Sequence, residues 1–461
     1  MVKKKVAWIV GIVGALALAV AVLTIAPDLQ HVGSANKFNS ALKAAHSAGI
    51  PATVEELLGP PIPDESNAAI ELNKARKILE ANKAYFDLLV GDIKKSHDDP
   101  TVLPAPFTPE AEQILALCRQ ASHKPSCSFE RNWSNPVRTT FPELPDLKFF
   151  AHMLGHDMVI QAEKGNWDTA EQDAVAISKI SQYCFSEPFQ FGFLLAHTIN
   201  TMNAKTMQRM VHKTDAHPRS LEIVEKVAGA SQPHSIMHYQ KGEAFMHIEI
   251  AKLLSNKKTS EGAYSVLGFS PPSQSGNALL DLWHKIKRKI DEPSEPYQSS
   301  QAVRTAQAAF IVEKATAKYK ALSANGDNID SLNTLLRKLE VDAQRSAKAN
   351  GAVWKMLSYA PNIADTLRTA DAQDALLKGA VEIHRYKAAK GKNPIAGDIV
   401  LPTDPFTDKD LILKTFKSGF SLYSLGANRK DDGGRIENSV SREEVDLVYR
   451  YRMPDTDFGG R

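Results

Sequence analysis

Two pairs of histidines have the spacing of metal ligands on a helix. His152 and His156 lie four residues apart in the segment His-Met-Leu-Gly-His-Asp, and His234 and His238 repeat the interval. Imidazole groups at positions i and i+4 leave a helix from one face, which is how helical zinc sites are built. One interpretation is therefore a transition-metal site formed by these four residues. The alternative is chance spacing, because the chain has 14 histidines and the first pair lacks the glutamate of helical zinc proteases.

The cysteines limit both disulfide and zinc chemistry. The chain has 3 cysteines, too few for a multi-cysteine zinc module or a scaffold stapled by disulfides. Cys118 and Cys127 flank a predicted loop, so they either form a disulfide or stay reduced and buried. A disulfide closing this short segment would contribute on the order of 2–3 kcal/mol. Cys184 ends an apolar segment, and we expect it to pack in the core rather than to act as a nucleophile.

The charge balance of the chain bears on whether it binds nucleic acid. The formal net charge is +3, and Lys3, Lys4 and Lys5 supply all of it, since the residues after them balance to zero. Proteins that bind nucleic acid need a basic surface that neutralises phosphates. We therefore expect no nucleic-acid partner. With 461 residues, 43% of them hydrophobic, the chain can form sizeable cores in about two domains.

Residues 6–25 form an apolar segment without a charged residue, VAWIVGIVGALALAVAVLTI. As a helix this segment would be about 30 Å long, which matches the hydrocarbon core of a bilayer. Because the lysines at positions 3–5 precede it, the positive-inside rule places the N-terminus in the cytoplasm and the bulk of the chain in the periplasm or outside the cell. The segment predicts a single-pass anchor. The alternative is a cleaved signal peptide, whose apolar part is usually shorter.

The rest of the chain is predicted to be mainly helical, with a small β unit at its end. We expect four regions: an anchor at 1–27, a stalk with a proline-rich linker at 28–63, a helical body at 64–372, and a C-terminal region at 373–461 that ends in a polar tail. Apolar periodicity predicts helices over 64–95, 110–121, 144–211 (three helices), 219–254, 278–290, 298–323, 329–349 and 362–390. The turn at Gly165 and Asn166 between amphipathic segments is typical of an αα-hairpin, so the body is predicted to be a multi-helix bundle. Short apolar runs near 399–401, 411–416 and 420–425 predict a small β-hairpin unit.

The C-terminal region also contains a series of turn-forming motifs. The segment YKAAKGKNP ends the last predicted helix, LPTDPF follows it, and FSLYSLGAN leads to DDGG at residues 431–434. This series resembles the C-terminal half of the major pseudopilins of type II secretion. It is more similar still to a set of membrane-anchored helical envelope proteins of planctomycete-type genomes, which have no assigned function. The N-terminus lacks the prepilin signature, so the resemblance does not extend to assembly into a pseudopilus.

In the pseudopilins the corresponding acidic loop binds calcium through carboxylates and carbonyl oxygens. The resemblance implies Asp431 and Asp432 as ligands here, with backbone oxygens near Leu425 completing the six to eight oxygens that calcium takes. Arg429 and Lys430 are adjacent, and their positive charge opposes a cation. We therefore expect at most weak, millimolar calcium binding. The alternative is a folded hairpin that holds no ligand.

These features predict a membrane-anchored extracytoplasmic protein without catalytic residues or a required cofactor. Its partners would be the membrane, through residues 6–25, and other proteins of the cell envelope. The alternative is a membrane-tethered, metal-dependent hydrolase that uses the histidine pairs.

Overall fold

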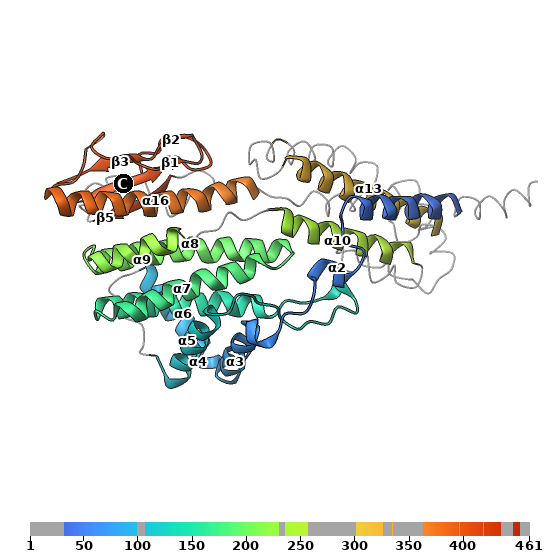
Figure 1. Ribbon diagram of the computed structural model, residues 1–461, viewed down its shortest axis with the longest axis horizontal. Helices are drawn as coiled ribbons and strands as arrows, with labels where there is room; N and C mark the ends of the chain where they lie inside the picture. Colours follow the sequence, from blue (N-terminus) through green and yellow to red (C-terminus); the bar gives the residue numbers. More distant parts are fainter. Residues whose placement is uncertain are drawn as a thin grey trace, which may run out of the picture. The chain divides into compact units, whose positions relative to one another are not determined.

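The computed structural model is mainly helical (Figure 1). It describes residues 32–98, 107–229, 236–256, 301–325, 334, 363–395, 397–417, 419–434 and 446–451. Short antiparallel strands follow the last helix. The predicted combination of a helical body with a small C-terminal β unit is therefore confirmed.

Several predicted segments lie outside the described residues. They are the apolar segment at 6–25, the helix at 278–290 and, apart from residue 334, the helix at 329–349. Within the part of the chain that is described, no helix has the length and apolar character needed to cross a membrane. The anchor therefore stays a prediction from the sequence.

The chain divides into two compact units, which we describe separately. Unit one comprises residues 1–59, 132–139 and 237–361, and unit two comprises residues 60–131, 140–236 and 362–461. These limits differ from the predicted ones at residues 63 and 372. Both units are assembled from segments that are far apart in the sequence, which a linear division of the chain does not anticipate.

Unit one contains packed helices, and two of its helical segments fall in the predicted stalk. Its helical segments are residues 32–47, α2 (Val54–Leu58), α10 (Ile236–Ser255) and α13 (Gln301–Asn325). Phe38, Ala41 and Ala45 lie on one face of the first segment and are buried in a core with residues of α10 and α13. The predicted polar stalk at 28–63 therefore contains a packed helix, because its few apolar residues recur at helical spacing.

Unit two contains most of the described helices. They are α3 (Ala69–Ala81), α4 (Lys83–Asp98), α5 (Pro109–Ser122), α6 (Glu143–Glu163), α7 (Trp167–Phe185), α8 (Gln190–Lys213), α9 (Pro218–Gly229) and α16 (Ile363–Lys390). The single helix predicted over 64–95 is wrong, since α3 and α4 are separated at Asn82. The Asn82 side chain donates to the Ile78 carbonyl at 3.0 Å, which competes with continuation of the helix. The segment 219–254 likewise contains two helices, α9 and α10.

The predicted run of three helices over 144–211 is confirmed as α6, α7 and α8. Gly165 has a φ of 80°, and this left-handed conformation lets the chain turn between α6 and α7. Phe150, Leu154 and Ile177 are buried in the core that these helices share with α3, α4 and α5.

The C-terminal strands form two small antiparallel sheets. They are β1 (Thr403–Asp404), β2 (Lys409–Asp410), β3 (Ile412–Thr415), β4 (Phe420–Ser424) and β5 (Leu447–Tyr451), with β1 paired to β2 and the others in the order β3-β4-β5. Residues 399–401, which we predicted as a strand, are not one. Conversely, β5 lies in the predicted polar tail, because its five residues form a strand only by pairing with β4.

The three-stranded sheet packs against α16, which lies between the sheet and helices α8 and α9 (Figure 1). Phe420 and Leu422 of β4 face the helix and are fully buried. Gly379 is the point of closest approach, since a Cβ atom there would lie 2.7 Å from Leu422 Cδ2. Ser421 and Tyr423 alternate with these residues and therefore lie on the opposite face of the sheet.

Candidate functional site

The acidic loop follows β4, and its two predicted ligands make hydrogen bonds within the loop. Asp431 Oδ1 accepts from the backbone N–H of Gly433 at 2.8 Å and from the Tyr423 hydroxyl at 3.1 Å. Asp432 Oδ2 accepts from the Asn428 side chain at 2.9 Å. The structure therefore places both aspartates in one loop, where each accepts hydrogen bonds from the protein itself.

Asp446 is a third carboxylate beside this loop, and it was not predicted from the sequence. It precedes β5, is 5% exposed, and accepts from the backbone N–H of Gly434 at 2.7 Å and from that of Asp432. Burial raises its pKa, and the carboxylates of Asp432 and Asp431 raise it further. Its second oxygen, Oδ1, is buried and has no hydrogen-bond partner among the described residues. No local motif marks this residue, because the pairing of β5 with β4 brings it to the loop.

Two cations from the flanking strands also contact this loop. Lys414 Nζ lies 3.2 Å from the carbonyl oxygen of Gly433, and the Arg450 guanidinium donates to the carbonyl oxygen of Gly434. Two carbonyl oxygens of the loop are thus already engaged by cations of the protein, so the residues present fit a calcium site poorly. The sequence analysis expected the opposing charge from Arg429 and Lys430, whereas the contacts described here come from Lys414 and Arg450.

The aspartate of the Asp-Pro-Phe motif, Asp404, has a structural role that requires no bound ligand. Its carboxylate is 2% exposed and accepts four hydrogen bonds. The donors are the backbone N–H of Phe406 at 3.0 Å, the Ser424 hydroxyl at 2.7 Å, the backbone N–H of Leu425 at 3.1 Å and the Thr407 hydroxyl at 3.2 Å. Asp404 therefore joins the turn after β1 to the end of β4, and the acidic loop starts from this junction.

The predicted histidine site is brought together only in part. His156 is buried in α6 and its ring meets the edge of Phe107 at 5.7 Å, whereas His152 is half-buried. His238 is exposed on α10, in the other unit, and His234 lies outside the described residues. Among the residues whose placement is described, no three His, Cys, Asp or Glu side chains are arranged to hold a metal ion. The four-histidine site stays a prediction.

The segment around His156 has a clear role in packing. A Cβ atom at Gly155 would lie 3.3 Å from Thr206 Cγ2, so this glycine lets α6 approach α8 closely. Asp157 pairs with Arg119 of α5, and Arg119 Nε also lies 2.7 Å from Asp173 of α7. Burial raises the pKa of Asp173 well above its usual range, Arg119 lowers it, and the neighbouring Asp157 carboxyl raises it. The three side chains join α5, α6 and α7 in the interior.

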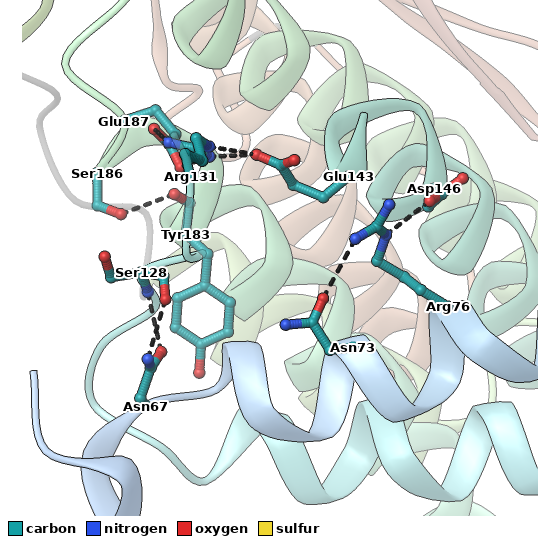
Figure 2. A network of polar contacts seen from close by, with 10 residues as sticks. All are labelled: Asn67, Asn73, Arg76, Ser128, Arg131, Glu143, Asp146, Tyr183, Ser186 and Glu187. Carbon is teal, nitrogen blue, oxygen red and sulfur yellow. Dashed lines mark hydrogen bonds and ion pairs between the residues drawn. The ribbon is translucent and has the colours of Figure 1, made fainter. Parts of the chain in front are cut away.

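A second arginine lies between two glutamates, and Figure 2 shows this cluster. Arg131 Nε donates to Glu143 Oε1 at 2.7 Å, and its NH1 group donates to Glu187 Oε2 at 2.7 Å. The three side chains are between 3% and 8% exposed. The guanidinium also lies 4.5 Å from the centre of the Phe141 ring. We call Arg131, Glu143 and Glu187 the Arg131 cluster.

Neighbouring residues hold the chain that carries Arg131. The Tyr183 hydroxyl donates to the carbonyl oxygens of Ala121 and Lys124, at 2.8 and 2.6 Å. Asn67 and Ser128 exchange two hydrogen bonds of 2.9 Å each (Figure 2). The extended segment after α5 is thus tied to α7 and to the start of α3, and the Arg131 cluster lies at its end.

The cysteines are buried thiols rather than nucleophiles. Cys118, Cys127 and Cys184 are all free in this structure, which is the second of the two alternatives left by the sequence for the first pair. Burial raises the pKa of each thiol, and nearby carboxylates raise it further. A thiol that stays protonated is a poor nucleophile. The expectation that Cys184 packs in the core is confirmed.

Comparison with known proteins finds no match, either to a family model, to a curated protein or to a solved structure. The resemblance of the C-terminal region to the pseudopilins and to the anchored envelope proteins therefore stays a prediction.

Proposed function

We propose that this chain is a membrane-anchored, extracytoplasmic protein that contacts other proteins of the cell envelope and catalyses no reaction. The proposal rests on two features. One is the apolar segment at 6–25, and the other is a helical body in which the buried carboxylates and arginines pair with one another and stabilise the fold. Neither a cofactor nor a metal ion is required for this role.

The observation that carries the proposal is the Arg131 cluster. A general acid or base has to reach a substrate, so its carboxyl group must face a cleft or solvent. In the Arg131 cluster both glutamates instead lie inside the unit and are each bound by the same guanidinium. The second arginine cluster, Arg119 with Asp157 and Asp173, likewise pairs one guanidinium with two carboxylates, and its two aspartates are at most 3% exposed. Buried pairs of this kind hold helices and the segments between them together, as a scaffold requires.

The anchor can be tested with the full chain expressed in a bacterial host. Membranes are washed with alkaline carbonate, and the N-terminus of the retained protein is sequenced. We expect the protein to stay in the membrane fraction with residues 6–25 intact. A variant with Leu16→Arg and Leu18→Arg should leave the membrane, because two charges at the centre of the segment oppose insertion. A mature N-terminus that begins after residue 25 would contradict the anchor.

The alternative of a metal-dependent hydrolase can be tested separately by measuring metal in the purified full chain. We expect substoichiometric zinc and iron, and helicity that is unchanged by a chelator. Stoichiometric metal that is lost in a His152→Ala/His156→Ala variant would favour the hydrolase instead.

The predicted topology can be tested with a C-terminal alkaline phosphatase fusion, which is active only when the body lies outside the cytoplasm.

A further inference from the structure

The acidic loop at residues 431–434 directs its backbone N–H groups toward carboxylates. Asp446 accepts from the N–H groups of Asp432 and Gly434, and Asp431 accepts from that of Gly433. Gly433 and Gly434 have φ values of 82° and 70°, which allow successive N–H groups to turn in this way. The N–H groups of the loop are thus directed at two carboxylates that belong to the protein, those of Asp431 and Asp446.

The carbonyl oxygens of the same loop point toward cations that also belong to the protein. Lys414 Nζ lies 3.2 Å from the Gly433 oxygen, and Arg450 donates to the Gly434 oxygen. The Lys414 ammonium additionally lies 5.0 Å from the centre of the Tyr423 ring. In a calcium loop the carbonyl and carboxylate oxygens instead converge on the ion. Here the two kinds of oxygen are directed to different partners.

The strand register explains why these two cations reach the loop together. Lys414 of β3 and Arg450 of β5 both lie opposite Ser421 of β4, one on each side. Residues that are directly opposite in an antiparallel sheet have side chains on the same face. Gly434 lies over this row, since a Cβ atom there would be 3.4 Å from Ser421 Oγ and 3.0 Å from the Tyr423 ring. The loop thus covers the face of the sheet that α16 leaves open.

We propose that Lys414 and Arg450 are internal counter-cations that close the acidic loop over the sheet in place of a metal ion, so that the C-terminal unit folds independently of calcium. This inference does not depend on the proposed function. It gives the charges of the loop a structural role: Asp446 joins the start of β5 to the loop, and Lys414 and Arg450 join the loop to both edge strands.

Lys414 offers the sharper test, because its side chain is exposed and its replacement leaves the core intact. The full chain is compared with a Lys414→Gln variant and with a Lys417→Gln control, which removes the same charge from an exposed position in the turn between β3 and β4. Melting temperatures are measured in EGTA and in 2 mM calcium. Terbium, which replaces calcium and is excited through nearby tyrosine, reports whether an ion binds beside Tyr423.

We expect the melting temperature of the wild-type chain and of the control to be the same in EGTA and in calcium. The Lys414→Gln variant should melt at a lower temperature in EGTA and recover part of the loss in calcium, with about tenfold tighter terbium binding than the wild type, since one opposing charge is removed. Two results would overturn the proposal. One is a wild-type chain that loses several degrees in EGTA, and the other is a Lys414→Gln variant that behaves like the Lys417→Gln control.

Discussion

His384 of α16 should make the stability of unit two depend on pH. Its side chain is 4% exposed and is surrounded by aromatic rings. The ring centre lies 4.4 Å from that of Tyr451, 5.2 Å from that of Phe420 and 6.5 Å from that of Tyr449. An imidazolium ion in this position would lose its hydration without gaining a full counter-charge.

The pKa of His384 is lowered from its ordinary value of 6.5 to about 4. Burial is the largest cause; the nearby Lys387 and His212 lower the pKa further, and Asp215 opposes them. Asp215 accepts a hydrogen bond from the Tyr451 hydroxyl, so part of its charge is already engaged. The lowered pKa means that the unfolded chain binds this proton more readily than the folded one.

The sign and size of the effect follow from proton linkage. Above pH 6.5 His384 is neutral in both states and contributes no pH dependence. As the pH falls from 6.5 to 4, only the unfolded state takes up the proton, so the free energy of unfolding decreases. A gap of about two and a half pKa units corresponds to about 3 kcal/mol at pH 4. This is a large fraction of the stability of an ordinary domain.

The assay is urea unfolding of the wild type and of a His384→Phe variant, followed by circular dichroism between pH 7 and pH 4. Phenylalanine keeps a ring among the aromatic neighbours and removes the titrating group. We expect the wild type to lose about 3 kcal/mol more than the variant over this range, while an exposed control, His123→Gln, keeps the wild-type slope. Equal slopes for the wild type and His384→Phe would show that this histidine is not held neutral by its surroundings.

Three further substitutions test the described packing, each by its effect on the urea midpoint at pH 7. Arg131→Met should cost about 3–5 kcal/mol, since it leaves both glutamates of its cluster buried without a counter-charge, whereas the exposed Arg138→Met should change stability by less than about 0.5 kcal/mol. Gly192→Ala should destabilise by about 1–3 kcal/mol, because a Cβ atom there would lie 2.5 Å from that of Glu187. Asp404→Ala should cost about 1–3 kcal/mol for each backbone N–H that it leaves buried without an acceptor. A neutral result for any of these would contradict the contact on which it rests.

Local sequence features predicted the helices α5 to α8 and α16 and the position of the β unit. The reason is that an amphipathic helix repeats its apolar residues every three or four positions, and turns need residues such as Gly165 that accept a positive φ. The same logic failed at Asn82, where one side-chain hydrogen bond ends a helix in an otherwise continuous pattern. It also failed at residues 32–47, where Phe38, Ala41 and Ala45, with Leu42 packed beside them, were sufficient for a packed face.

The candidate site was predictable only as far as it is local. Asp431 and Asp432 are adjacent in the sequence and could be identified as a pair of carboxylates. Asp446, by contrast, reaches them through the pairing of β5 with β4, and no pattern in the sequence specifies that register. The spacing of His152 and His156 correctly placed both residues on one helix. The packing of α6 against its neighbours, however, buries His156 inside the unit, which the spacing alone does not indicate.

Most of the described helices and turns could be predicted from the sequence alone, because they depend on residues within a few positions of one another. Which charged side chains form ion pairs, by contrast, depends on the tertiary structure. Arg131 pairs with Glu187, 56 positions away, and Lys414 and Arg450 meet across a common row opposite Ser421. An ion pair needs two side chains within about 4 Å of each other. Helix packing and strand register set that distance, and neither can be predicted from composition or from the spacing of residues along the chain.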